Sequence, residues 1–249
     1  MTKIISVHSF RHGTGKSTII ANLATILAQQ GKQVAVIDTD FQTPTIHSIF
    51  KLNDVQIQYW FNDYLNKKCT IQQISYPIIP NPKNNGQIYV IPAKSDTSIS
   101  KTLNQLYKSN RLGDSIEDVL TTLDLDIVLI DLYSGLQEET IFTINISDNL
   151  LVVLRPDLQD YQGSSVIVEV ARRLDIGPQL MLVLNEVPTQ FDLADVKTEL
   201  MIKYDCETVF ALPHVKQFAL TQTDDIFVKQ HPNHHLTTLL TEIATRLAL

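Results

Sequence analysis

The chain has 249 residues and a hydrophobic content of 44%, which is enough to bury a large core, and we expect one domain spanning residues 1–249. A formal net charge of −7 argues against general adhesion to nucleic acid or acidic membranes, although a local basic patch could still bind either. The N-terminal residues lack the long apolar segment of a signal peptide, and no apolar run approaches the ~20 residues of a membrane span. Cys69 and Cys206 stand far apart in no metal-ligand spacing. We therefore expect a cytoplasmic protein.

Short apolar runs recur along the chain, with helical patterns between them. They cover residues 4–7, 34–37, 88–91, 127–130, 150–154, 180–184 and 208–212. Continuous apolar runs, unlike alternating ones, indicate strands that are covered on both faces, as in a parallel sheet. Together with the intervening helices they predict an α/β fold, namely a doubly wound, mostly parallel sheet with helices on both faces.

Two helices are marked by apolar stripes. In the first, Ile19, Leu23, Ile26 and Leu27 share one face, and Gly31 follows as a stop. The second covers residues 236–249, and its stripe consists of Leu236, Leu239, Leu240, Ile243 and Leu247. We expect this last helix to pack on the core.

Residues 53–86 break the rhythm of strands and helices. They contain Pro77, Pro80 and Pro82, and an Asn-Asn-Gly sequence at 84–86. These residues favour turns over regular elements. We expect a partly helical insertion that ends in an exposed loop.

A glycine-rich loop lies between the first apolar run and the first helix. Residues 13–18 read Gly-Thr-Gly-Lys-Ser-Thr, and this setting lets backbone N–H groups approach a phosphate closely. Lys16 is then placed for the β- and γ-phosphates and the Ser17 hydroxyl for Mg²⁺. An ordinary Walker A loop has glycine five residues before its second glycine, where this chain has Phe10. The loop is therefore of another subtype.

Residues 11–17, Arg-His-Gly-Thr-Gly-Lys-Ser, resemble the deviant Walker A loop of the ParA/MinD family of positioning ATPases. The family pattern is Lys-Gly-Gly-x-Gly-Lys-[Ser/Thr], and its first lysine reaches the phosphates of the other subunit in an ATP-sandwiched dimer. Arg11 stands at that lysine position and His12 replaces a glycine. Arg11 keeps the positive charge but differs from lysine in shape and reach, so it could instead be an exposed loop cation. In this replacement of the first lysine, the chain resembles the carboxysome-distributing McdA subgroup of the family.

Three carboxylates follow apolar runs and should meet at the carboxyl edge of the sheet. Asp38 and Asp40 resemble the Asp-x-Asp switch of the family, which implies that Asp40 orients the attacking water and Asp38 supports the Mg²⁺ shell. Asp131 ends a Walker B-like run and should bind Mg²⁺ through water. The sequence Leu-Tyr-Ser-Gly at 132–135 departs from the Cys-Pro-Pro or Ser-Pro-Ala that the family usually has there.

The resemblance also implies an adenine site. Asn185 and Pro213 end two later apolar runs and are similar to the adenine-binding segments of the family, although Asn185 could equally be a turn residue before Pro188. We expect Lys16, Asp38, Asp40 and Arg11 to be catalytic, and Ser17, Asp38 and Asp131 to hold the metal. The expected ATP contacts are Arg11, His12, Gly13, Thr14, Gly15, Lys16, Ser17, Thr18, Asn185 and Pro213.

Three functional classes remain open. The first, which the resemblance favours, is an ATP-dependent homodimer that binds nonspecific DNA at the nucleoid, hydrolyses ATP when an adaptor protein activates it, and so positions a plasmid, chromosome or carboxysome. Lys101, Lys108 and Arg111 could form its DNA patch, or simply a solvated helix face. The second is a MinD-like membrane positioner, disfavoured because Arg246 is the only basic residue of the last helix. The third is a metabolic P-loop enzyme of the same fold.

A histidine cluster near the C-terminal helix invites a metal interpretation. His231, His234 and His235 surround a Pro-Asn pair at the start of that helix, without the spacing of a metal site. We expect these residues to form a polar segment that caps the helix. The expected cofactors are ATP and Mg²⁺.

Overall fold

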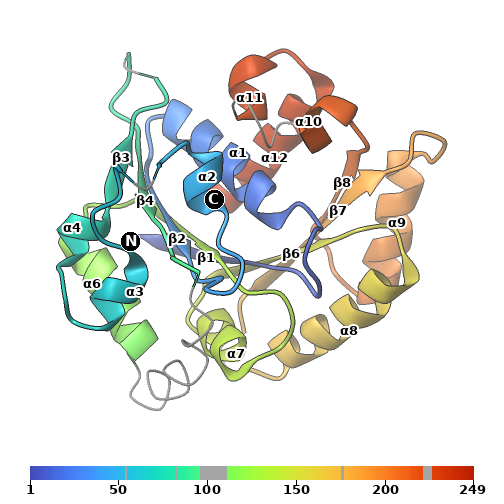
Figure 1. Cartoon of the computed structure of the whole chain (residues 1–249). Coiled ribbons are helices and arrows are strands. Elements are labelled where there is room, and N and C mark those ends of the chain that lie inside the picture. The colour runs from blue at the N-terminus through green and yellow to red at the C-terminus, as the bar shows by residue number, and fades with distance from the viewer. Residues whose placement is uncertain (54, 82, 96–110, 175–176, 221–225) are drawn as a thin grey trace.

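The computed structural model describes residues 1–53, 55–81, 83–95, 111–174, 177–220 and 226–249. Its strands are β1 (Lys3–His8), β2 (Gln33–Asp38), β3 (Tyr76–Ile78), β4 (Gln87–Ile91), β5 (Ile127–Asp131), β6 (Asn149–Leu154), β7 (Gln179–Val187) and β8 (Val209–Pro213). They form one eight-stranded sheet in the order β3-β4-β2-β5-β1-β6-β7-β8 (Figure 1). Every neighbouring pair is parallel except β3 with β4. Each of the predicted apolar runs forms a strand.

Helices cover both faces of the sheet. They are α1 (Lys16–Gln29), α2 (Ile46–Ile49), α3 (Phe61–Leu65), α4 (Ile71–Ile74), α6 (Arg111–Thr122), α7 (Glu138–Asn145), α8 (Leu158–Arg172), α9 (Leu193–Tyr204), α10 (Lys216–Leu220), α11 (Phe227–Gln230) and α12 (His235–Ala248). Consecutive strand residues alternate between two hydrophobic cores: Val34 and Val36 join the core around α1 and α12, whereas Ala35 and Ile37 join the core around α6 and α8. The doubly wound α/β fold is confirmed.

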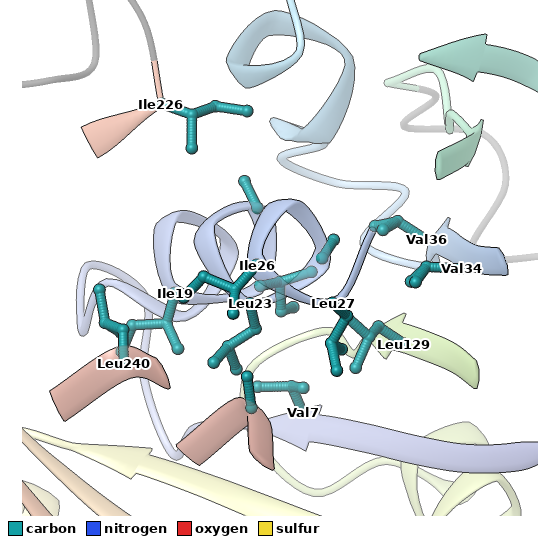
Figure 2. Close-up of a cluster of buried hydrophobic side chains, with 14 of the residues drawn as sticks. Val7, Ile19, Leu23, Ile26, Leu27, Val34, Val36, Leu129, Ile226 and Leu240 are labelled. Carbon is teal, nitrogen blue, oxygen red and sulfur yellow. The ribbon is translucent and has the colours of Figure 1, made fainter. Parts of the chain in front are cut away.

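Helix α1 packs on one face of the sheet and lies beside α12, which contacts β8 on the same face. The predicted stripe of Ile19, Leu23, Ile26 and Leu27 is buried, and Figure 2 shows these side chains between Val7 and Leu129 of the sheet and Leu240 of α12. From α12, Leu236, Leu240, Ile243 and Leu247 are fully buried. Burying one such side chain contributes roughly 1.5–3 kcal/mol. The last helix therefore packs on the core, as predicted.

The insertion at 53–86 differs in part from the prediction. It contains the short helices α3 and α4, as expected, but also β3, which pairs antiparallel with β4 at the edge of the sheet. Pro77 is in this strand and lies opposite Tyr89. A proline is tolerated in an edge strand because no further strand requires its missing N–H group. The prolines that suggested a loop are therefore compatible with the strand.

The Asn-Asn-Gly sequence is not a freely exposed loop either. Asn84 Nδ2 donates to the carbonyl of Gln29 at 2.5 Å, and Gly86 is buried. A Cβ atom at Gly86 would lie 1.9 Å from the carbonyl oxygen of Ala28. The segment therefore packs against the C-terminal end of α1, and this close approach requires glycine at position 86.

Candidate nucleotide-binding site

The glycine-rich loop connects β1 to α1 at the carboxyl edge of the sheet. Gly13 and Gly15 have φ angles of 80° and 90°, a left-handed conformation that glycine adopts without strain. Helix α1 begins at Lys16, so its unpaired N–H groups and positive dipole end face the cleft above the loop. Seven of the predicted ATP contacts line this cleft: His12, Gly13, Thr14, Gly15, Lys16, Ser17 and Thr18.

Lys16, Ser17 and Asp131 meet at the floor of the cleft. The Lys16 ammonium contacts Asp131 Oδ1 in an ion pair, and Ser17 Oγ donates to Asp131 Oδ2 at 2.6 Å. Both members of the ion pair are buried, with 7% and 1% of their side chains exposed. A buried charge needs such a partner, because an unpaired one would carry a large desolvation penalty. The three residues predicted around the metal and phosphates are thus in direct contact.

Asp38 lies beside Asp131 because β2 and β5 are neighbours and the two aspartates are register partners. Its carboxylate is fully buried and accepts hydrogen bonds from the backbone N–H groups of Asp40, Thr45 and Ile46 at 3.0, 3.2 and 3.3 Å. Burial, and then the negative charge of Asp131, raise the pKa of Asp38 well above its ordinary value. Asp38 therefore fixes the start of α2 and forms a pair of closely spaced carboxyl groups with Asp131.

Asp40 lines the same cleft from the loop after β2. Its Oδ1 accepts from the N–H groups of Thr43 at 2.9 Å and Gln42 at 3.2 Å, and its Oδ2 accepts from Thr43 Oγ1 at 2.9 Å. Only 5% of the residue is exposed. The carboxylate is therefore held in one orientation by its own loop.

His12 and Tyr133 stand next to Asp40. His12 Nδ1 lies 3.7 Å from Asp40 Oδ2 and 3.4 Å from Thr43 Oγ1. The His12 ring meets the Tyr133 ring edge to face, with centroids 5.1 Å apart. Sequence reasoning gave Tyr133 no role. The one sequence feature that could have drawn attention to Tyr133 is that the Leu-Tyr-Ser-Gly segment departs from the family pattern.

Arg11 does not line this cleft. Its guanidinium lies against the first turn of α8, where it pairs with Asp157 and, through Nε, with Asp160 Oδ1 at 2.7 Å. Gln159 Oε1 accepts a further bond from it at 3.3 Å. Burial raises the pKa of Asp160, and the positive charge of Arg11 opposes that shift. Within this chain, acidic residues at the start of α8 therefore hold Arg11 away from the cleft.

The two residues expected at the adenine do not line the cleft. Asn185 is buried behind the phosphate loop, where its Nδ2 donates to the Thr14 carbonyl at 2.9 Å. A Cβ atom at Gly15 would lie 2.4 Å from that nitrogen, so Asn185 packs directly under the loop. Pro213 is the final residue of β8. The structure thus places Asn185 as a support of the loop backbone, which the turn interpretation of the sequence did not anticipate.

Of the three residues expected to bind DNA, the structure describes only Arg111. Lys101 and Lys108 lie outside the described residues. Arg111 begins α6 and donates from Nη1 to the Leu65 carbonyl at the end of α3, at 3.1 Å. One nitrogen of Arg111 is therefore engaged within the chain.

The C-terminal histidines form no metal site among the described residues. His234 is the N-cap of α12, and its Nδ1 accepts from the N–H group of Leu236 at 3.0 Å. This is the capping role that the sequence predicted. In the part of the chain that the structure covers, no helix has the length and apolarity to cross a membrane.

His8 was not predicted to matter. It ends β1 below the phosphate loop, and its Nε2 lies 2.8 Å from the Gly135 carbonyl oxygen. Because a carbonyl oxygen only accepts, the proton must be on Nε2. Complete burial lowers the pKa of His8 to about 4, the hydrogen bond to Gly135 opposes this shift, and the charge of Lys16 adds to it. His8 is therefore neutral at physiological pH and ties the loop after β5 to β1.

Comparisons with known proteins agree with this geometry. A family model described as AAA domain matches residues 2–182. An uncharacterised ATP-binding protein of Methanocaldococcus jannaschii is 29% identical and aligns with 99% of this chain and 88% of its own length. The septum site-determining protein MinD of Buchnera aphidicola is 28% identical over 68% of this chain and 59% of MinD.

Solved structures share the fold over almost the whole chain. MinD of Pyrococcus horikoshii, complexed with Mg-ADP, superimposes with a TM-score of 0.76 at 20% identity, covering 99% of this chain and 96% of that chain. Apo McdA of Cyanthece gives a TM-score of 0.76 at 17% identity, covering 98% and 100%. With an AAA domain model over most of its length, MinD among its relatives and this fold, the chain belongs to the ParA/MinD family of P-loop ATPases.

Proposed function

We propose that this chain acts as one Mg²⁺-dependent ATPase domain that positions a cargo inside the cell. The observation that carries the proposal is the convergence of Lys16, Ser17 and Asp131 at the N-terminus of α1, with Asp40 in the same cleft. A helix N-terminus with glycines and a lysine binds phosphate, and carboxylates beside it hold the accompanying metal.

The side chains at the floor of the cleft fit Mg²⁺. Asp131, Asp38 and the Ser17 hydroxyl supply oxygen atoms, which are the ligands that Mg²⁺ prefers. Asp131 is now neutralised by Lys16. Bound Mg²⁺ would neutralise charge on the phosphates and carboxylates. The Lys16 ammonium would turn from Asp131 to the β- and γ-phosphates, and the backbone N–H groups of residues 13–18 would hold the phosphate oxygens.

Asp40 would orient the attacking water. Its carboxylate faces the cleft, and Thr43 and Gln42 hold it by hydrogen bonds. A carboxylate fixed in this way can accept a hydrogen bond from a water molecule. The lone pair of that water's oxygen would then face the γ-phosphate. Asp38 would keep the start of α2 in place through its bonds to Thr45 and Ile46.

The test is ATP turnover by wild type, Lys16→Ala and Asp40→Ala with and without Mg²⁺. Wild type should hydrolyse ATP only with the metal. Asp40→Ala should keep nucleotide binding and lose about 10²–10⁴-fold in kcat, as expected for a lost water-positioning group, whereas Lys16→Ala should lose binding. A wild type that neither binds ATP nor turns it over with Mg²⁺ present would reject this function.

For the cellular role, we favour an ATP-dependent homodimer that binds nonspecific DNA at the nucleoid and is stimulated by an adaptor protein. The likeness to MinD and McdA supports a positioning role in general. Arg11 would leave Asp157 and Asp160 to reach the partner's nucleotide, and Lys101, Lys108 and Arg111 would contribute to DNA contact. The adenine would lie toward Asn185 and Pro213.

The packing of α12 argues against membrane binding through this helix. Such binding would need a free apolar face, but Leu236, Leu240, Ile243 and Leu247 are fully buried against the core. Co-sedimentation of the protein with anionic vesicles in the presence of ATP would overturn this view. A metabolic P-loop enzyme remains the second alternative, and nucleotide-independent monomers would favour it.

A further inference from the structure

Two departures from the family loop patterns meet in space. His12 stands where the ParA/MinD loop has glycine, and Tyr133 lies in the segment that replaces Cys-Pro-Pro. Far apart in the sequence, they are in edge-to-face contact, with ring centroids 5.1 Å apart and an interplanar angle of 69°. Aromatic pairs in this geometry attract each other beyond simple burial. Neither glycine nor proline could form this contact.

The pair links three loops at the mouth of the cleft. His12 belongs to the loop after β1 and Tyr133 to the loop after β5. In the loop after β2, Gln42 Oε1 accepts from the Tyr133 hydroxyl at 3.1 Å, and Thr43 Oγ1 lies 3.4 Å from His12 Nδ1. We name this set of four residues, His12, Gln42, Thr43 and Tyr133, the loop clasp.

The loop clasp ends on Asp40. The Thr43 hydroxyl has a single proton, which it donates to Asp40 Oδ2 at 2.9 Å. Its oxygen can then accept a hydrogen bond from the N–H group at His12 Nδ1, and the hydrogen bonds run in one direction from His12 through Thr43 to Asp40. Hydrogen bonds in such a chain strengthen one another. His12 itself, half-exposed and lining the cleft, lies only 3.7 Å from Asp40 Oδ2.

We propose that His12 is a positioning residue: braced by Tyr133, it orients Thr43 and so holds the Asp40 carboxylate for water activation. The proposal rests on the ATPase function proposed above. The sequence placed His12 among the expected ATP contacts, but its side chain contacts Thr43, Asp40 and Tyr133 rather than Lys16 or Ser17. The effect should therefore fall on kcat, and a change in nucleotide affinity would support the earlier expectation instead.

The experiment compares kcat, KM and the dissociation constant for a fluorescent ATP analogue across a variant series. His12→Gly installs the residue of the family pattern, and Tyr133→Ala removes the brace. Each should lower kcat by about ten-fold, as expected when a catalytic group is displaced by a fraction of an ångström, with KM and the dissociation constant within about two-fold of wild type. His12→Asn keeps a polar atom near the position of Nδ1 and should recover part of kcat. His235→Ala, an exposed histidine on α12, is the matched control.

The double variant tests the coupling. If His12 acts through the contact with Tyr133, the His12→Gly/Tyr133→Ala protein should be no slower than the slower single variant. Independent, multiplicative losses would overturn the proposal. So would an unchanged kcat in His12→Gly, or a rise in KM with kcat unchanged, which would make His12 a nucleotide ligand instead.

The proposal can fail separately from the ATPase function. A wild type without ATP turnover would reject the function. The loop clasp would then be judged by urea unfolding of wild type, His12→Gly, Tyr133→Ala and the double variant. Non-additive shifts of the midpoint support a coupled His12–Tyr133 pair, and additive shifts overturn it.

Discussion

His8 has no exposed surface, and in the folded protein it does not take up a second ring proton until the pH approaches 4. In the unfolded chain it takes up a proton near its ordinary value of 6.5. Between these values the unfolded state binds more protons at this position, so the free energy of unfolding falls as the pH falls. The loss attributable to His8 should total about 3 kcal/mol across that window.

His8→Gln keeps a side-chain donor for the Gly135 carbonyl but does not titrate. Urea unfolding at several pH values should therefore give a weaker dependence on pH between 6.5 and 4 for this variant than for wild type. The raised pKa of Asp38 produces an opposite slope in both proteins, so the difference between the two curves isolates His8. Parallel curves would show that folding does not lower the pKa of His8.

Asn185 supports the phosphate loop from below through the Thr14 carbonyl. Asn185→Ala removes that donor and leaves a buried carbonyl oxygen without its side-chain partner. We expect the free energy of unfolding to drop by about 1–3 kcal/mol and the affinity for MgATP to weaken, measured by urea unfolding and calorimetry. If affinity falls with no change in stability, Asn185 contacts the nucleotide rather than the loop.

At the scale of elements, the phosphate loop packs against α8 through Phe10 and Gly163. A Cβ atom at Gly163 would lie 2.0 Å from Phe10 Cγ, so Gly163→Ala should destabilise the wild-type protein by about 1–3 kcal/mol. In a Phe10→Ala background the same change should stabilise by up to about 1 kcal/mol, because alanine is the better helix former. Thermal unfolding of the four proteins should show this reversal of sign. An equal effect in both backgrounds would mean that Phe10 moves aside without cost.

The contact between helices α1 and α12 can be tested with two neighbouring leucines of α12, one of which serves as the control. Leu240 is fully buried, whereas the neighbouring Leu239 is only partly buried. Leu240→Ala should lower the free energy of unfolding by about 2–5 kcal/mol, and Leu239→Ala by clearly less. Similar losses in urea unfolding would contradict the observed orientation of α12.

At the scale of the whole molecule, the proposed homodimer depends on Arg11, which Asp157 and Asp160 hold within one chain. Light scattering of Asp40→Ala should show a dimer that forms only with MgATP. Adding Arg11→Ala should abolish the dimer while nucleotide binding persists, because Arg11 does not line the cleft. A dimer that survives the Arg11 substitution would show that another group takes the role of the family's lysine.

Much of this architecture was predictable because its information is local. Strands buried on both faces must be continuously apolar, so each parallel strand stood out in the sequence. Strand β3 did not, since three residues with a proline at a sheet edge have no such pattern. The packing of Asn84 and Gly86 on α1 was equally hidden, because it depends on a helix far away in the chain.

The residues of the candidate site also fall into two groups, those whose positions follow from local sequence and those whose positions depend on distant contacts. Lys16, Ser17 and Asp131 were predictable because a short motif and two strand ends determine where they lie. The positions of His8, Tyr133 and Asn185 were not, because each contacts a loop that is distant in sequence. Arg11 was predictable as a cation at the loop but not in its attachment to α8.

The packing of α12 beside α1 also affects how the protein is made. Helix α1 leaves the ribosome early with an apolar stripe, and residues 235–248, which shield one side of it, are translated long afterwards. Until then the nascent chain exposes Leu23 and its neighbours, a surface that chaperones bind and that promotes aggregation. A prematurely terminated chain would therefore contain every residue of the phosphate loop, yet it would lack the packing that keeps the loop's helix in place.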